Sequence, residues 1–143
     1  MRFPVALLKH TTLALAALMS SCAAAAPQTP PDFTIAFFGD QGLGSNSEAV
    51  LNLVKSEGAD AVIHLGDFDY EDDPKAWEKQ INGILGKDFP YFACIGNHDT
   101  KGWSGKRGYQ ARLEKRLKRL GVRWNGDLGA QSSVTYKGIF IAL

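Results

Sequence analysis

The sequence has few cysteines, few histidines and almost no net charge. Its 143 residues include two cysteines, Cys22 and Cys94, and the formal charge is +1. If Cys22 belongs to a cleaved or lipidated leader, Cys94 alone is left and an intrachain disulfide is excluded. A near-neutral charge gives no general attraction to nucleic acid or to an anionic membrane. Any affinity for a charged ligand must therefore come from a local site.

Long apolar runs are also absent after the first residues. The chain begins with Arg2 and Lys9 near a run, TTLALAALMSSCAAAA, that is short for a membrane span and ends in small residues. We interpret residues 1–26 as a signal peptide for export to the periplasm or the extracellular space. A membrane anchor helix and a lipid anchor at Cys22, which would give a membrane-anchored lipoprotein, are the alternatives.

The rest of the chain is expected to form a short linker, residues 27–32, and one domain from residue 33 to residue 143. Consecutive prolines keep the linker extended. No transmembrane helix is expected in the mature form.

Short apolar strands alternate with amphipathic helices in the first part of the domain. The runs FTIAFF, AVIHL and YFACI predict strands buried on both faces, at residues 33–38, 61–65 and 91–95. Helices are predicted at residues 46–57, 74–85 and 109–120. This order favours a largely parallel sheet.

Finer features of these elements also follow from the sequence. In the first helix we expect one buried face, made of Ala49, Val50, Leu53 and Val54. Asp72 and Asp73 are expected to cap the second helix ahead of Pro74. Beyond the third helix, VRW, SSVTY and IFIAL predict strands, joined by NGDLGA and by a tight KG hairpin, with IFIAL as a central strand.

Polar residues follow each of the first three strands. They occur in the segments GDQG, GDFDY and GNHD. Because ligands bind beyond the carboxyl ends of parallel strands, these loops should converge at one place. Several carboxylates in a partly dry site repel one another unless cations neutralise them, which favours a metal site with hard oxygen donors.

Other interpretations of single residues stay open. Tyr70 could be only a packing aromatic. His64 alternates with apolar neighbours on its strand. It is expected to be a hydrogen-bonded core histidine or a residue that contacts the site residues without binding the ligand itself. Cys94 is expected to be an inert thiol. A nucleotide-binding Rossmann domain is a weaker alternative, because no Gly-x-Gly-x-x-Gly follows the first strand.

GDQG, GDFDY and GNHD resemble, in order and spacing, the first three motifs of the calcineurin-like metallophosphoesterases. The tyrosine three residues after the second aspartate resembles the purple acid phosphatase branch. The resemblance implies two metal ions, Fe(III) and a divalent ion (Fe, Zn or Mn), and hydrolysis of a small phosphorylated substrate by activated water. No nucleic-acid partner is expected.

The resemblance also implies a role for each motif residue. Asp40 and Tyr70 would bind the first metal, Asp67 would bridge both metals, and Asn97 would bind the second. His98 would contact the phosphate or protonate the leaving oxygen. Asp99 would orient His98.

The sequence departs from the family in its histidines. The later motifs of the family supply histidine ligands, whereas this chain has only His10, His64 and His98. We therefore expect a truncated chain that forms the N-terminal half of a four-layer α/β/β/α sandwich, with weak metal affinity and negligible turnover. The alternative to an enzyme is a non-catalytic metal- or phosphate-binding fragment.

Overall fold

The computed structural model describes residues 32–143. The predicted signal peptide, with Cys22 and His10, and nearly all of the predicted linker lie outside the described residues, so these interpretations stay predictions. Among the residues that are described, no helix is long and apolar enough to cross a membrane.

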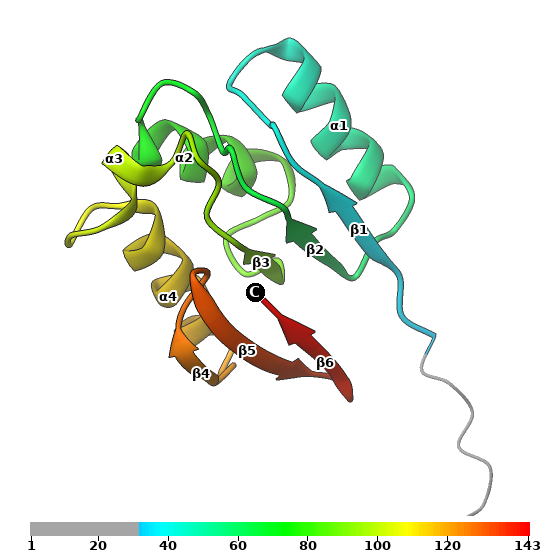
Figure 1. Cartoon of the computed structure of the whole chain (residues 1–143). Helices are drawn as coiled ribbons and strands as arrows, with labels where there is room; N and C mark the ends of the chain where they lie inside the picture. Colours follow the sequence, from blue (N-terminus) through cyan, green and yellow to red (C-terminus); the bar gives the residue numbers. More distant parts are fainter. Residues whose placement is uncertain (1–31) are drawn as a thin grey trace, which may run out of the picture. The chain divides into compact units, whose positions relative to one another are not determined.

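Strands and helices alternate from residue 35 to residue 103, and one more helix follows (Figure 1). The elements of this region are β1 (Ile35–Phe38), α1 (Ser45–Ser56), β2 (Ala61–His64), α2 (Pro74–Ile84), β3 (Tyr91–Ala93), α3 (Thr100–Trp103) and α4 (Tyr109–Arg119). Three strands complete the described residues: β4 (Trp124–Asp127), β5 (Gln131–Tyr136) and β6 (Ile139–Ala142). Each predicted strand and helix is present, with bounds that differ by a few residues.

The strands form two separate sheets. In the first, β1, β2 and β3 are parallel in that order, with Ile35 opposite Ala61 and Val62 opposite Tyr91. In the second, β4, β5 and β6 are antiparallel in that order. The mixed α/β class predicted from the sequence is confirmed, with both a parallel and an antiparallel sheet.

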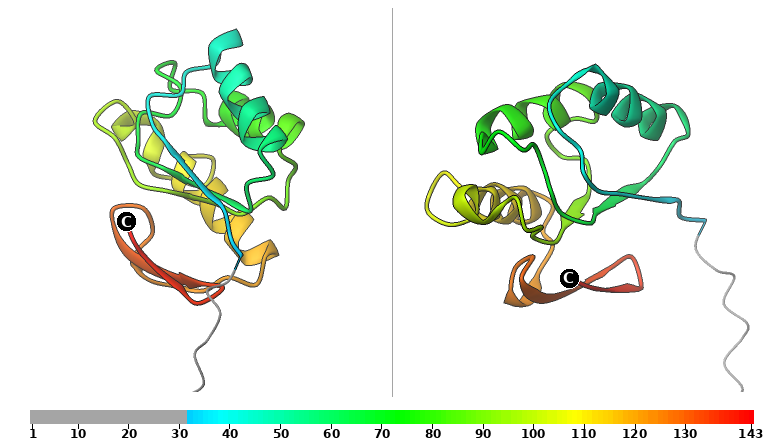
Figure 2. Two further views of the ribbon diagram at one scale, coloured as in Figure 1. Left: turned by 90° about the vertical axis from the view of Figure 1, so that its right-hand side faces the viewer. Right: turned by 45° about the horizontal axis from the view of Figure 1, so that its top comes forward.

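The parallel sheet lies between helices and the antiparallel sheet (Figure 2). Neighbouring residues of β3 show the two environments. The Arg116 guanidinium of α4 lies over the Tyr91 ring, whereas the next ring, Phe92, packs against Tyr136 of β5 with centroids 5.4 Å apart. Because side chains alternate across a strand, β3 packs against both layers. Burial on both faces explains the apolar runs in the sequence.

Three details differ from the sequence predictions. Helix α1 buries Ser47, Leu51 and Val54 and exposes Val50 and Leu53. The prediction chose the wrong face because apolar residues occur on more than one side of this helix, so periodicity alone could not select the buried face. The segment NGD belongs to β4, since it pairs with β5 through Gly126, whose φ of +83° favours glycine. Within the described residues β6 pairs only with β5, so it is not a central strand there.

The ends of α2 and of the second sheet follow the sequence closely. Asp73 accepts hydrogen bonds from the backbone N–H groups of Lys75 and Ala76, as a cap ahead of Pro74 should. Asp72 makes no such bond and lies 4.0 Å from the Lys101 ammonium, so its predicted capping role is wrong. The predicted KG hairpin joins β5 and β6, directly after Tyr136.

Candidate metal centre

The loop after β1 presents Asp40 at the edge of the parallel sheet. Its backbone is tied to the loop after β2: the N–H of Asp40 donates to the carbonyl of Gly66 at 3.1 Å, and the N–H of Gln41 donates to the carbonyl of Asp67 at 2.9 Å. Asp40 has a left-handed backbone, with φ of +53°, and an exposed side chain. The two loops therefore hold Asp40 in a conformation that most residues avoid.

The loop after β2 approaches the loop after β3 very closely. A Cβ atom added to Gly96 would overlap the backbone and carboxylate of Asp67, and one added to Gly66, whose φ is +99°, would lie 2.7 Å from the Gly96 Cα. Only glycine allows this approach. The glycines of the motifs GDFDY and GNHD are therefore required by the contact between the two loops.

Asp99 fixes the conformation of the Asp67 loop. Its side chain, 1% exposed, accepts hydrogen bonds from the backbone N–H groups of Asp67 at 2.9 Å, Phe68 at 2.8 Å and Gly96 at 2.7 Å. Both of its oxygens serve backbone donors, and the structure gives it no hydrogen bond to the His98 imidazole. In this structure Asp99 thus positions Asp67, which has a φ of +59°.

Tyr70 reaches across to the first loop. Its hydroxyl donates to Oδ1 of Asp40 at 2.5 Å, and its φ is +61°. This hydrogen bond, desolvation and the charges of Asp40, Asp67 and Asp99 raise the pKa of Tyr70 to about 12. The contact joins two predicted ligands from different loops. It also means that a phenolate here requires a cation to replace the shared proton.

The third loop brings His98 next to both of the others. The backbone N–H of His98 donates to Oδ1 of Asp67 at 3.0 Å, and its ring lies 4.9 Å from the ring of Tyr70, centroid to centroid. Asn97 precedes it and is exposed in the same loop. The loops after β1, β2 and β3 therefore meet at one edge of the sheet.

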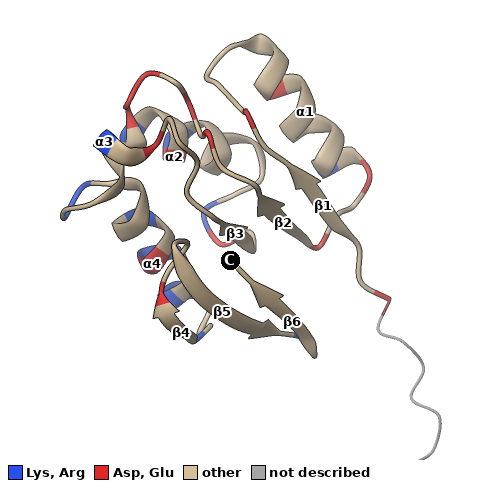
Figure 3. Ribbon diagram, viewed as in Figure 1, with Lys and Arg blue, Asp and Glu red and all other residues tan. Residues whose placement is uncertain are grey.

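Acidic residues gather at this edge (Figure 3). Among residues 32–143, no three His, Cys, Asp or Glu side chains are arranged to hold a metal ion. A site here depends instead on the tyrosine hydroxyl and the asparagine amide in addition to Asp40 and Asp67. The four groups are hard oxygen donors, which suit iron, manganese or magnesium.

The comparison with protein families agrees with this geometry. The family model described as calcineurin-like phosphoesterase matches residues 33–140. The chain belongs to the calcineurin-like phosphoesterase family. Members typically bind two metal ions, and membership indicates metal-dependent hydrolysis of phosphoesters. Comparisons with curated proteins and with solved structures gave no match.

Within this calcineurin-like phosphoesterase domain, His64 and Cys94 lie near the site, and their environments are those of structural residues. His64 is fully buried, its Nδ1 accepts from the N–H of Gly66 at 3.3 Å, and burial lowers its pKa to about 3, as expected for a core histidine. Burial likewise raises the pKa of the Cys94 thiol, in keeping with an inert cysteine.

Sequence reasoning missed two glutamines, one within the loop of Asp40 and one that contacts this loop from α2. Gln41 lies inside the first motif, and Gln80 lies on α2 between the buried residues Trp77 and Ile81. The one available signal was the position of Gln80 beside the apolar stripe of α2, because a side-chain amide at such a position needs hydrogen-bond partners. Asp69, unassigned from the sequence, is 2% exposed and accepts from the N–H of Glu71 within its own loop.

Proposed function

We propose that this domain hydrolyses small phosphate esters at a dinuclear metal site, with Asp40, Asp67, Tyr70 and Asn97 as ligands. The observation that carries the proposal is the convergence of three loops, with the Tyr70 hydroxyl 2.5 Å from Asp40. Three of the four proposed ligands also have a positive φ. Strained backbone of this kind clusters at functional sites, and here it supports a role for these three residues as metal ligands.

Each donor has a proposed place. Asp40 and Tyr70 would hold the first ion, Asp67 would lie between the two ions, and Asn97 would hold the second. Bound ions would acidify a water and neutralise charge on the phosphate. A strongly charged first ion suits a tyrosine ligand, because only a strong Lewis acid makes a phenol, whose ordinary pKa is about 10, a phenolate near neutral pH. Ferric iron, and with it the purple acid phosphatase type, is our proposal for this position.

His98 is the proposed proton donor to the leaving oxygen. Its side chain is exposed beside the Tyr70 ring, while its backbone N–H holds Asp67. A protonated imidazole can donate a hydrogen bond to a phosphate oxygen or protonate an alkoxide. Asp99 contributes by holding the bridging carboxylate in place.

A second candidate function is metal or phosphate binding without turnover. The described residues contain two histidines, and one of them, His64, is fully buried with no hydrogen-bond partner for Nε2. This part of the chain therefore gives the second ion no imidazole ligand beyond His98. A loosely held second ion would not fix the phosphate for attack.

Metal titration and hydrolysis separate these candidates from each other and from a purely structural domain. The whole chain is titrated with Mn²⁺ or Zn²⁺ in a calorimeter and then assayed with a chromogenic phosphate ester. Asp67→Asn should weaken binding by at least about tenfold, whereas Asp72→Asn, in the same loop, should leave it unchanged. Equal binding by the two variants would refute the proposed site. Binding without turnover would support the second candidate, and metal-dependent turnover lost in Asp67→Asn would support the first.

The remaining proposal concerns location. The charged start and apolar run of residues 1–26 support export of the mature domain. Mass spectrometry of the exported protein would reveal cleavage, and an intact Met1 on cytosolic protein would contradict it.

A further inference from the structure

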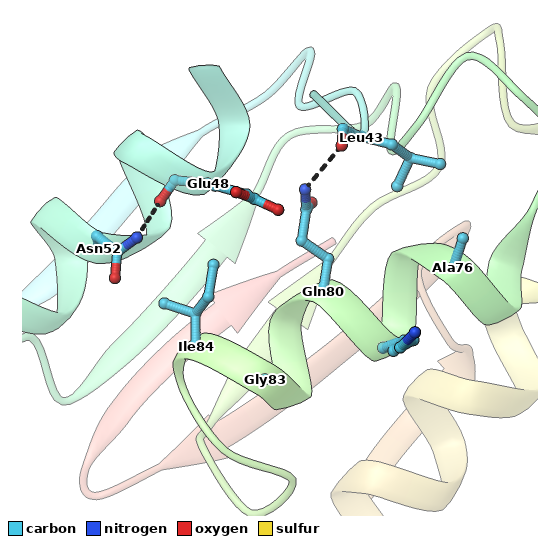
Figure 4. Close-up of a pocket in the computed structure, with 8 residues that line it drawn as sticks. Leu43, Glu48, Asn52, Ala76, Gln80, Gly83 and Ile84 are labelled. Carbon is cyan, nitrogen blue, oxygen red and sulfur yellow. Dashed lines mark hydrogen bonds between the residues drawn. The ribbon is translucent and has the colours of Figure 1, made fainter. Parts of the chain in front are cut away.

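A chain of hydrogen bonds joins the loop after β1 to the middle of α2. The side-chain amide of Gln41 donates to Oε1 of Gln80 at 2.8 Å. Nε2 of Gln80 donates in turn to the carbonyl of Leu43 at 3.1 Å and to the hydroxyl of Ser47 at 3.0 Å. Figure 4 shows Gln80 pointing from α2 toward Leu43. One glutamine of α2 therefore holds the loop at two points.

The same loop is held from β3 and from the loop after β2. The Tyr91 hydroxyl, fully buried, donates to Oε1 of Gln41 at 2.9 Å. The backbone N–H of Gln41 donates to the carbonyl of Asp67 at 2.9 Å. Gln41 thus connects a helix, a strand and the neighbouring ligand loop, and its side-chain amide uses both its oxygen and its nitrogen.

Gln80 stands where packing alone would favour an apolar residue. It lies between Trp77 and Ile81, which are both buried, and it lines a groove of about 430 Å³ between α1 and α2. Burying part of a side-chain amide costs stability unless the amide makes its hydrogen bonds within the protein. Networks of this kind specify one conformation of the groups they join.

The residue next to Gln41 is Asp40, whose left-handed backbone must be held by its surroundings. We propose that Gln80 is a positioning residue for the metal site: acting through Gln41, it keeps Asp40 in the conformation that meets Tyr70. The part of this inference that concerns metal rests on the proposed function. The part that concerns the loop does not.

Hydrogen exchange of the metal-free whole chain tests the loop directly. In Gln80→Met, which keeps the length of the side chain, the N–H groups of Asp40 and Gln41 should exchange at least about tenfold faster than in the wild type. The N–H of Val62, which donates to Pro90 in the core, should be unaffected. Lys79→Met, the same replacement at the exposed neighbouring position, is the matched control and should change neither.

A double-mutant cycle tests whether Gln80 acts through Gln41. Gln41→Met removes the shared contact from the loop side, so Gln41→Met combined with Gln80→Met should have a smaller effect than the sum of the two single changes. Additive effects, or unchanged exchange at Asp40 in Gln80→Met, would overturn the inference. Because exchange needs no metal, a wild type that binds none would refute the proposed function and leave this result standing.

Metal titration adds a second readout. If wild type binds Mn²⁺, Gln80→Met should bind it about tenfold more weakly while Lys79→Met binds as wild type does. Equal affinities for wild type and Gln80→Met would overturn the role of Gln80 at the site.

Discussion

Replacing Asp99 by asparagine, a side chain of nearly the same size, should destabilise the domain. The Asp99 carboxylate is buried and accepts three backbone N–H groups: Oδ2 serves Asp67 and Gly96, and Oδ1 serves Phe68. Asparagine retains one oxygen, which can take the place of Oδ2. Its amide nitrogen then faces the N–H of Phe68, so that two donors meet without an acceptor.

The magnitude follows from these contacts. A hydrogen bond to a charged acceptor contributes about 1.5–3 kcal/mol, and a buried donor left unsatisfied costs about 1–3 kcal/mol. Losing one such bond and weakening the other two should lower the free energy of unfolding by about 2–4 kcal/mol.

Urea unfolding of the whole chain, followed by tryptophan fluorescence, measures this change. Asp88→Asn is the control: Asp88 is half-exposed and pairs with Arg119 at 3.2 Å, so its loss should cost less than about 1 kcal/mol. Asp99→Asn and Asp88→Asn variants of equal stability would refute the positioning role that we assign to Asp99.

Two further predictions concern other buried groups. Burial, opposed by the charge of Asp40, lowers the pKa of His64 to about 3, so the unfolded chain takes up a proton first and stability is lost as pH falls from 6.5 toward 3. Between pH 7 and pH 5, wild type should lose about 2 kcal/mol more than His64→Gln in denaturant titrations, and equal losses would contradict this. Arg116, 2% exposed, donates to the carbonyls of Gly86 and Phe89 at 3.1 Å and to the Asn82 side chain. Because lysine lacks the guanidinium fork, Arg116→Lys should lower the free energy of unfolding by about 2 kcal/mol, against less than about 1 kcal/mol for the more exposed Arg119→Lys; similar losses would count against a bridging role.

The elements of the fold were predictable where local chemistry decides them. Pro74 after an acidic cap marks the start of α2, and the apolar runs mark the parallel strands. The buried face of α1 was not predictable, because Val50 and Leu53 are as apolar as Leu51 and only packing against α2 distinguishes them. The strand through Gly126 was missed because Asn and Gly favour turns, whereas pairing with β5 overrides that preference.

The candidate site was predictable at the level of loops. A Gly-Asp or Gly-Asn pair after each strand places Asp40, Asp67 and Asn97 at one sheet edge, because parallel strands end on the same side. The supporting contacts were not. The bonds of Asp99 to Asp67 and Phe68 and the Gln41–Gln80 contact join residues 31 to 39 positions apart, and no local pattern encodes such contacts.

The most direct test of the account is the visible spectrum of the whole chain titrated with Fe³⁺. If Tyr70 and Asp40 share a metal ion, wild type should develop a tyrosinate charge-transfer band, and Tyr70→Phe should lose it while Tyr136→Phe, at the hairpin of the second sheet, keeps it. A band that survives in Tyr70→Phe, or its absence from a folded wild type saturated with Fe³⁺, would contradict a ferric site at this edge of the sheet.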